Sequence, residues 1–218
     1  MNEVALRKEI CRVGKSLFDR GYVHSTAGNI SAVLDDGFLI TPTDACLGNL
    51  LPNQLSKIDR QGKQLSGNVA SKTLALHRRI YSADSAAKCV IHTHSTHLVA
   101  LTLKGVWSNA DILPPITPYY LMKVGHVPLI PYYRPGDTQS GDRVAEAIEA
   151  ARSAGVPLRA VMLDRLGPNV WHSSPAQACA VLEELEETAR LWLMTIPRPE
   201  ALNQQQIAEI CETFKLTW

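Results

Sequence analysis

The chain has 218 residues and a mass of 23.9 kDa, which is enough for one sizeable hydrophobic core but short for two enzyme-sized domains. A hydrophobic fraction of 45%, a charged fraction of 20% and a mean hydropathy of −0.06 exclude disordered, collagen-like and fibrous proteins. With 22 basic and 21 acidic residues and no long basic cluster, the composition argues against nucleic-acid binding. We therefore expect one folded domain over residues 1–218.

The first residues mix charged and apolar side chains, without the apolar core of an export signal. No stretch approaches the roughly 18 apolar residues that a membrane-spanning helix needs. The five cysteines are spread along the chain without a CxxC pair, which argues against a disulfide framework and a thiolate zinc site. We interpret them as small buried hydrophobes and expect a cytoplasmic protein without a membrane partner.

In the first third of the chain, apolar residues at helical spacing predict a helix over residues 3–20 that ends at Gly21. Turn signals at residues 35–37 and 60–63 separate short apolar runs, so each turn is expected to join two strands. The expected strands are residues 29–34, 38–41, 55–59 and 64–65. A helix over residues 71–82 follows.

Further along, the apolar strand at residues 89–91 runs into the polar sequence His92-Thr93-His94-Ser95, and a helical pattern follows. The remaining periodic segments predict helices at residues 96–103, 141–154, 174–195 and 204–214, and strands at residues 127–130, 160–163 and 169–171. This order predicts an α/β fold, a single-domain α/β/α sandwich with a central, largely antiparallel sheet. The order of the strands does not follow from the sequence.

His92 and His94 are the strongest local signal for chemistry. On an extended strand their side chains project from the same face and could hold one metal ion through neutral ring nitrogens. Two polar residues at the end of a strand would give the same pattern, so both interpretations stay open.

Two other segments are suited to binding an anion. Residues 26–31 place a glycine and several hydroxyl or amide groups between a helix and a strand. Ser71, Lys72 and Thr73 add two hydroxyls and a cation at the expected start of a helix, where backbone N–H groups are free. An ordinary turn and an ordinary helix cap would explain the same residues.

Taken together, residues 26–31, 39–43, 71–77 and 90–94 resemble the class II aldolase family, which includes fuculose-phosphate aldolase and ribulose-phosphate 4-epimerase. The resemblance runs almost the whole length of the chain. Within the family, the chain looks most like the branch of 3-oxo-tetronate 4-phosphate decarboxylases. Four segments carry this similarity: Leu47-Gly48, Ser71-Lys72-Thr73, YYRPGD at residues 132–137 and EELEETA at residues 183–189.

The resemblance implies a site for a phosphorylated sugar acid. It assigns the phosphate and substrate to Thr26, Asn29, Thr43, Asp44, Ser71 and Lys72. His92 and His94 would be ligands of a divalent metal, with zinc expected. Lys72, Thr73 and Tyr119 occupy catalytic positions, with Tyr120 as an alternative to Tyr119 for the proton donor. The family also implies a C4 homotetramer with active sites between neighbouring subunits.

Three positions depart from the aldolase pattern. Thr73 stands where aldolases have a glutamate that serves as metal ligand and acid/base, and Leu166 stands where they have a third zinc histidine. Asp44 replaces a glycine near the phosphate, where its carboxylate would repel the ligand unless it points away or a cation lies between them. His172 is a candidate for the missing imidazole, although an exposed surface position explains it better. No third protein ligand is identified.

The departures favour decarboxylation over aldol cleavage. Retro-aldol cleavage needs a base that takes a hydroxyl proton, whereas a 3-oxo acid loses CO2 from a carboxylate that is already ionised. The leading hypothesis is a metal-assisted 3-oxo-tetronate 4-phosphate decarboxylase that forms dihydroxyacetone phosphate and CO2. A sugar-phosphate aldolase or epimerase is the second hypothesis, and a metal-free, non-catalytic member of the fold is the third.

Overall fold

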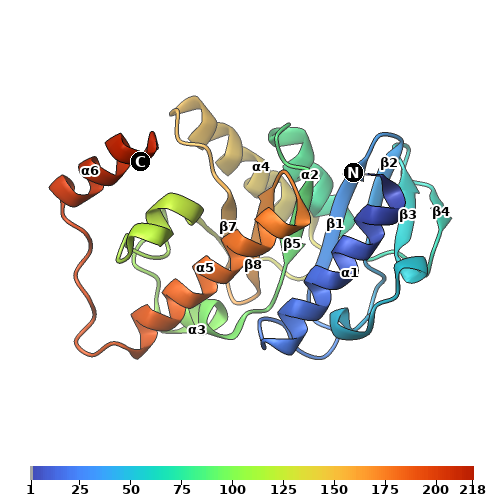
Figure 1. The fold of residues 1–218 in the computed structure, drawn as a ribbon, viewed down its shortest axis with the longest axis horizontal. Helices are drawn as coiled ribbons and strands as arrows, with labels where there is room; N and C mark the ends of the chain where they lie inside the picture. Colours follow the sequence, from blue (N-terminus) through green and yellow to red (C-terminus); the bar gives the residue numbers. More distant parts are fainter. Residues whose placement is uncertain (1) are drawn as a thin grey trace.

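A computed structural model describes residues 2–218, whose centre is a single eight-stranded sheet (Figure 1). The strands lie in the order β4-β3-β2-β1-β5-β8-β7-β6. Their bounds are β1 (Asn29–Leu34), β2 (Gly37–Ile40), β3 (Ser56–Asp59), β4 (Gln64–Ser66), β5 (Cys89–His92), β6 (Leu129–Ile130), β7 (Ala160–Leu163) and β8 (Gly167–His172). All neighbouring pairs are antiparallel except β6 and β7, which confirms the predicted largely antiparallel sheet.

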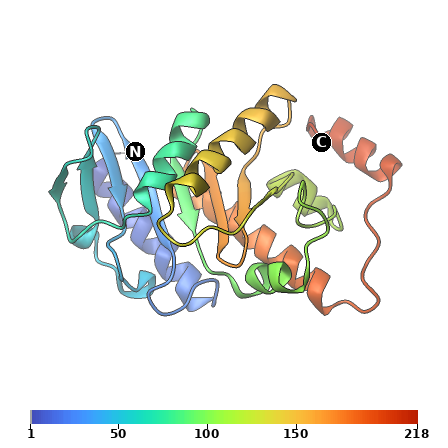
Figure 2. The same cartoon turned by 180° about the vertical axis from the view of Figure 1, so that it is seen from behind.

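Helices cover both faces of the sheet, as the sandwich prediction requires. One face carries α1 (Glu3–Asp19), α3 (Thr96–Lys104) and α5 (Pro175–Met194), and the other carries α2 (Leu74–Ala83) and α4 (Thr138–Ser153) (Figures 1 and 2). Because side chains alternate along a strand, the central strands supply two separate apolar layers. In β5, for example, Cys89 and Ile91 pack toward α1 and α5, whereas Val90 packs toward α2 and α4.

The C-terminal part extends beyond these layers. The π-helical segment η3 (Tyr120–Val124) packs against α5, and α6 (Gln204–Phe214) lies at the end of the molecule remote from α1 and β4 (Figure 1). No residue of α6 is buried in the chain.

Several boundaries differ from those predicted, for local reasons. α2 begins at Leu74 because residues 71–73 form a turn, in which the N–H of Leu74 donates to the carbonyl of Ser71. α4 begins earlier than predicted because the side chain of Asp137 caps it by accepting from the N–H of Gln139. β6 is shorter than predicted because the carbonyl of Val127 accepts instead from the N–H of Ile112 in a neighbouring loop.

The cysteines of the described chain are free, and Cys89 and Cys179 are buried as predicted, whereas the other three are half-buried. Among residues 2–218, no helix combines the length and apolar character needed to cross a membrane.

Candidate active site

The two histidines of the His-Thr-His sequence lie where β5 ends. His92 is the last residue of β5 and is only 4% exposed, whereas His94 follows in the loop before α3 and is half-buried. The helix after this loop is held by Glu186 of α5, which is buried and accepts hydrogen bonds from the backbone N–H groups of His97 and Leu98. Glu186 therefore caps α3 and fixes the chain directly after the histidines.

Two glycines allow neighbouring backbone to pack tightly on this loop. A Cβ atom on Gly28 would lie 2.8 Å from the carbonyl oxygen of His92, and one on Gly167 would lie 1.9 Å from the carbonyl oxygen of Thr93. Both glycines also have positive φ angles, of +81° and +142°. The β7–β8 turn and the loop before β1 are thus packed on either side of the histidine segment.

Strand register places two asparagines beside His92. Asn29 of β1 and Asn169 of β8 each pair directly with His92, one on either side of β5. Paired residues project from the same face, so the three side chains form a row on the face covered by α2 and α4. We call this set the Asn29–His92–Asn169 row.

The row holds buried polar atoms that have no partner within the described chain. They are Oδ1 of Asn29 and both amide atoms of Asn169, and Nε2 of His77 in α2 is also unpaired. His77 uses its other ring nitrogen for a 2.8 Å hydrogen bond with the hydroxyl of Ser31. Buried polar groups without partners destabilise a fold, so a cluster of them indicates a place where a ligand supplies the missing partners.

The environment keeps the histidines neutral. Burial, and to a lesser degree His94, lowers the pKa of His92 to about 4, against a hydrogen bond to the carbonyl of Pro168 that raises it. The pKa of His94 is also lowered, mainly by burial and then by His24. The 2.9 Å contact between Nδ1 of His92 and the carbonyl oxygen of Pro168 requires the proton on Nδ1. Nε2 of His92 is therefore a lone-pair donor, as a metal ligand must be.

The distance between the rings suits a shared metal ion. A metal–nitrogen bond of about 2.1 Å and a tetrahedral angle place two imidazole centroids about 5 Å apart. The centroids of His92 and His94 lie 5.1 Å apart. The two imidazoles thus fit as a pair of ligands to one divalent metal.

The histidine pair has no third His, Cys, Asp or Glu ligand within residues 2–218. No group of three or more such side chains in this part of the chain could hold a metal. Leu166 packs against the apolar layer under α2 and α4, and the hydroxyl of Thr73 accepts a 3.2 Å hydrogen bond from Ser71. His172 pairs with Cys89, at the opposite end of β5 from His92 and on the opposite face. His172 therefore cannot replace the missing imidazole.

The residues predicted to bind phosphate form two groups. Asn29 lies in the row beside His92, and Thr26 is exposed in the adjacent loop. Thr43 and Ser71 lie on neighbouring segments, because the N–H of Thr43 donates to Val69 and that of Ser71 donates to Thr41. Lys72 next to Ser71 is exposed and forms no ion pair within residues 2–218.

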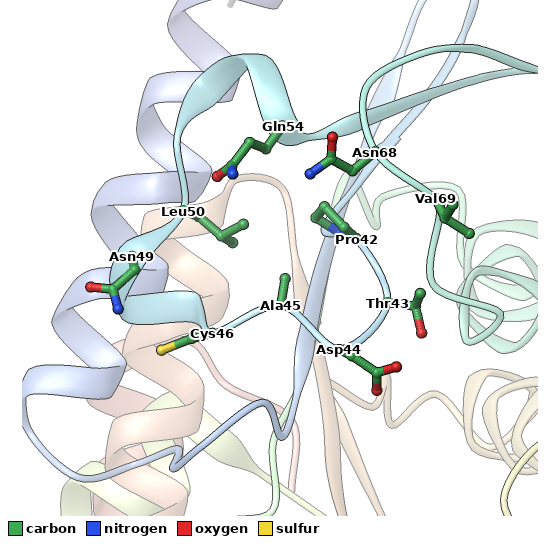
Figure 3. A pocket seen from close by; sticks show the side chains of 10 residues that line it. All are labelled: Pro42, Thr43, Asp44, Ala45, Cys46, Asn49, Leu50, Gln54, Asn68 and Val69. Atoms are coloured by element: carbon green, nitrogen blue, oxygen red, sulfur yellow. The ribbon is translucent and has the colours of Figure 1, made fainter.

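A hollow of about 480 Å³ lies beside the second group, and its lining includes Thr43 and Asp44 but neither histidine (Figure 3). The carboxylate of Asp44 points away from the amides of Gln54 and Asn68 at the other side of the hollow (Figure 3). Asp44 has a φ of +52°, a left-handed backbone conformation that glycine adopts without strain.

The two candidate proton donors have opposite environments. Tyr119 is 60% exposed at the start of η3, whereas Tyr120 is fully buried against α5, and burial raises its pKa far above the usual value. Tyr120 belongs to the apolar layer on the face opposite His92, so it cannot act at the histidine pair of its own chain. Of the two, only Tyr119 is accessible to a substrate.

The sequence assigns no functional role to two residues of the site: Asn169 falls in a predicted short strand, and Glu186 lies in the EELEETA segment of the family resemblance. His77 is fully buried, and one of its ring nitrogens is unpaired. The one available signal was that Asn169 interrupts an apolar strand two residues before Trp171, and so shares a face with that buried side chain.

Comparison with known proteins shows a match to the family described as class II aldolase and adducin N-terminal domain over residues 8–193. A 3-oxo-tetronate 4-phosphate decarboxylase of Cupriavidus necator is 53% identical over 221 residues, which cover 99% of both chains. An L-fuculose phosphate aldolase of Methanocaldococcus jannaschii is 27% identical over 87% of this chain and 97% of its own.

The solved structures include YgbL from Escherichia coli, which superposes with a TM-score of 0.86 at 39% identity. The superposition covers 95% of this chain and 98% of YgbL. The predicted fold is thereby confirmed, and the named decarboxylase is much more similar in sequence than the aldolase.

Proposed function

Because this chain belongs to the class II aldolase and adducin family, we propose that it is a carbon–carbon lyase that decarboxylates a 3-oxo-tetronate 4-phosphate. The products would be dihydroxyacetone phosphate and CO2. The observation that carries the proposal is the 53% identity to a protein of that name along 99% of both chains. The chemistry of the site agrees with it, since Thr73 offers no base for aldol cleavage.

The reaction breaks one carbon–carbon bond. The bond between C1 and C2 breaks, its electron pair moves to C2 and through it to the ketone oxygen at C3, and C1 leaves as CO2. The resulting enediolate then takes one proton at C2 to give dihydroxyacetone phosphate. The site must therefore stabilise negative charge on the ketone oxygen and deliver a proton at C2.

Four side chains suit these tasks. A divalent metal held by His92 and His94 would polarise the ketone, and zinc is among the ions that imidazole ligands suit. The ammonium group of Lys72 is exposed and free of ion pairs within residues 2–218, so it can place positive charge beside the developing oxyanion. Tyr119 would protonate C2.

The phosphate group would be bound by the hydroxyls of Thr26, Thr43 and Ser71 and the amide of Asn29, with Lys72 supplying charge. Asp44 would shape the loop through its left-handed backbone conformation rather than bind the phosphate.

We also propose a homotetramer, in which Tyr119 acts at the site of a neighbouring subunit. Its exposure and its position on η3, which packs against α5 and not against α2, support a role outside its own chain. The cytoplasmic location remains a prediction from the sequence.

The proposal is tested by comparing two reactions of the purified protein. Formation of dihydroxyacetone phosphate is followed with a coupled dehydrogenase assay, from a 3-oxo-tetronate 4-phosphate and, separately, from fuculose 1-phosphate. We expect rapid turnover only of the oxo acid, above its spontaneous decarboxylation in the same buffer. Faster cleavage of fuculose 1-phosphate would reject the decarboxylase in favour of an aldolase.

A further inference from the structure

We infer that Asn169 is a third protein ligand, through its amide oxygen, of the divalent metal held by His92 and His94. The inference rests on the histidine pair of the proposed function and adds to it a residue outside the pattern of the aldolases. It starts from the amide group of Asn169, which is buried in the sheet beside His92 and has no partner for either of its polar atoms.

An unpaired amide in this position needs an explanation. Asn169 is 0% exposed, and its neighbours on the same face are Val161 of β7 and Trp171 two residues along β8. An apolar side chain could occupy this position without loss, whereas a buried amide without hydrogen bonds lowers the free energy of unfolding by about 1–3 kcal/mol. A bound ligand that takes up the amide oxygen removes part of that cost.

The strand register places the side chain of Asn169 next to His92, whose Nε2 is free to bind a metal. Asn169 pairs directly with His92 across adjacent antiparallel strands, where paired Cβ atoms lie about 5 Å apart. The protonated Nδ1 of His92 donates a hydrogen bond to the carbonyl of Pro168, the residue just before Asn169. The ring of His92 is therefore held by the strand that carries Asn169. Both side chains then face the same space below α2, with Nε2 of His92 available.

Other candidate donors are placed less favourably or carry no donor atom. Leu166 carries no donor, and His172 lies on the other face of the sheet at the far end of β5. Thr73 has its hydroxyl hydrogen-bonded to Ser71. Asn29 flanks His92 from β1 and its buried oxygen is also unpaired, but the ring of His92 is held from β8, by the carbonyl of Pro168 next to Asn169.

The donor set predicts the kind of ion that binds. Two imidazoles and one neutral amide oxygen provide no negative charge, so the ion keeps its full charge toward the substrate. An amide oxygen is also a harder ligand than a third imidazole, which reduces the preference for zinc over manganese. We therefore expect weaker zinc binding than in a three-histidine site.

The test is a titration of the metal-free full-length protein with Co²⁺, followed by visible absorption, and with Zn²⁺, followed by elemental analysis after dialysis. Asn169→Leu, which has nearly the same shape, should weaken Co²⁺ binding at least tenfold. The same substitution should raise the melting temperature of the metal-free protein, because it removes a buried unpaired amide. Asn169→Asp should bind Co²⁺ at least tenfold more tightly than the wild type.

His94→Ala is the control for the histidine pair, because His94 is only half-buried and its replacement should leave the fold intact. Loss of binding in His94→Ala together with wild-type affinity in Asn169→Leu would overturn the role of Asn169 alone. If Asn169→Leu does not fold, unchanged affinity in Asn169→Asp overturns it equally. A wild-type protein that binds no Co²⁺, or a His94→Ala variant that binds it normally, would overturn the metal site of the proposed function as well.

Discussion

At the scale of single residues, the site contains neutral, buried side chains whose polar atoms lack hydrogen-bond partners. Beside them it contains one exposed cation, Lys72. His92, His77 and the two flanking asparagines have little access to water, whereas Lys72 has no partner among residues 2–218. A positive charge opposite uncharged groups suits a substrate that carries a carboxylate and a phosphate.

Lys72 is expected to be essential for turnover. Lys72→Met keeps the length of the side chain and removes its charge, so it should lower kcat for decarboxylation about 100-fold or more. Lys63→Met is the matched control, since Lys63 is exposed in a turn and contributes only backbone hydrogen bonds. Equal rates for Lys72→Met and the wild type in the coupled assay would remove Lys72 from the mechanism.

The buried imidazole of His77 makes the fold sensitive to acid. Burial, and to a lesser degree His92, lowers its pKa from 6.5 to about 3. The neutral form therefore stabilises the fold fully above pH 6.5, and this contribution is lost as the pH falls from about 6.5 toward about 3. Each pH unit in that window costs about 1.4 kcal/mol.

His77→Gln should remove this dependence. Urea unfolding at pH 7 and pH 5 should show the wild type losing about 2 kcal/mol more stability than the variant between the two values. A constant difference between the two proteins at both pH values would mean that His77 is protonated in the fold or exposed to water.

At the scale of elements, the histidine loop depends on close backbone packing from the β7–β8 turn. Gly167 is the clearest example, because its backbone is left-handed and a Cβ there would overlap the carbonyl of Thr93. The turn and the end of β5 are therefore held in one arrangement, which also aligns Asn169 with His92.

Gly167→Ala should destabilise the protein by about 3 kcal/mol or more, because steric overlap adds to backbone strain. Gly155→Ala is the control, since Gly155 also has a positive φ, of +78°, but nothing lies within 4 Å of the added atom. It should cost about 1–2 kcal/mol from strain alone. Denaturant unfolding of both variants measures the difference, and equal losses would show that the turn moves aside easily.

Most elements of this fold could be predicted from local patterns. The hairpin of β1 and β2 and the boundaries of α6 follow from turn and cap residues within the segments themselves. The start of α2 could not be predicted, because it depends on the turn at Ser71, which is fixed by the distant residue Thr41. Asn169 was missed for the same reason, since only the sheet register brings it beside His92.

At the scale of the whole molecule, Tyr119 and Lys72 adjoin elements that pack on opposite faces of the sheet. Tyr119 lies at the start of η3 near α5 and α6, and Lys72 precedes α2 on the other face of the sheet. The proposed tetramer would unite them between subunits. Its mass would be four times the 23.9 kDa of one chain.

Mixing two inactive variants tests this arrangement. Lys72→Met and Tyr119→Phe tetramers are unfolded together, mixed in equal amounts and refolded. If each site takes Lys72 from one subunit and Tyr119 from its neighbour, about a quarter of the sites recover both residues. Activity near a quarter of the wild type is expected, whereas no recovery would place both residues in the site of a single chain.

The central claim is that this protein removes C1 of a 3-oxo-tetronate 4-phosphate and protonates C2. The most direct measurement is carbon NMR of the reaction in D2O, with substrate labelled with ¹³C at C1 and heat-denatured protein as the background. We predict labelled CO2 and bicarbonate in a one-to-one ratio with dihydroxyacetone phosphate that carries one deuterium at the former C2. Loss of the labelled carboxylate no faster than with heat-denatured protein would contradict the account.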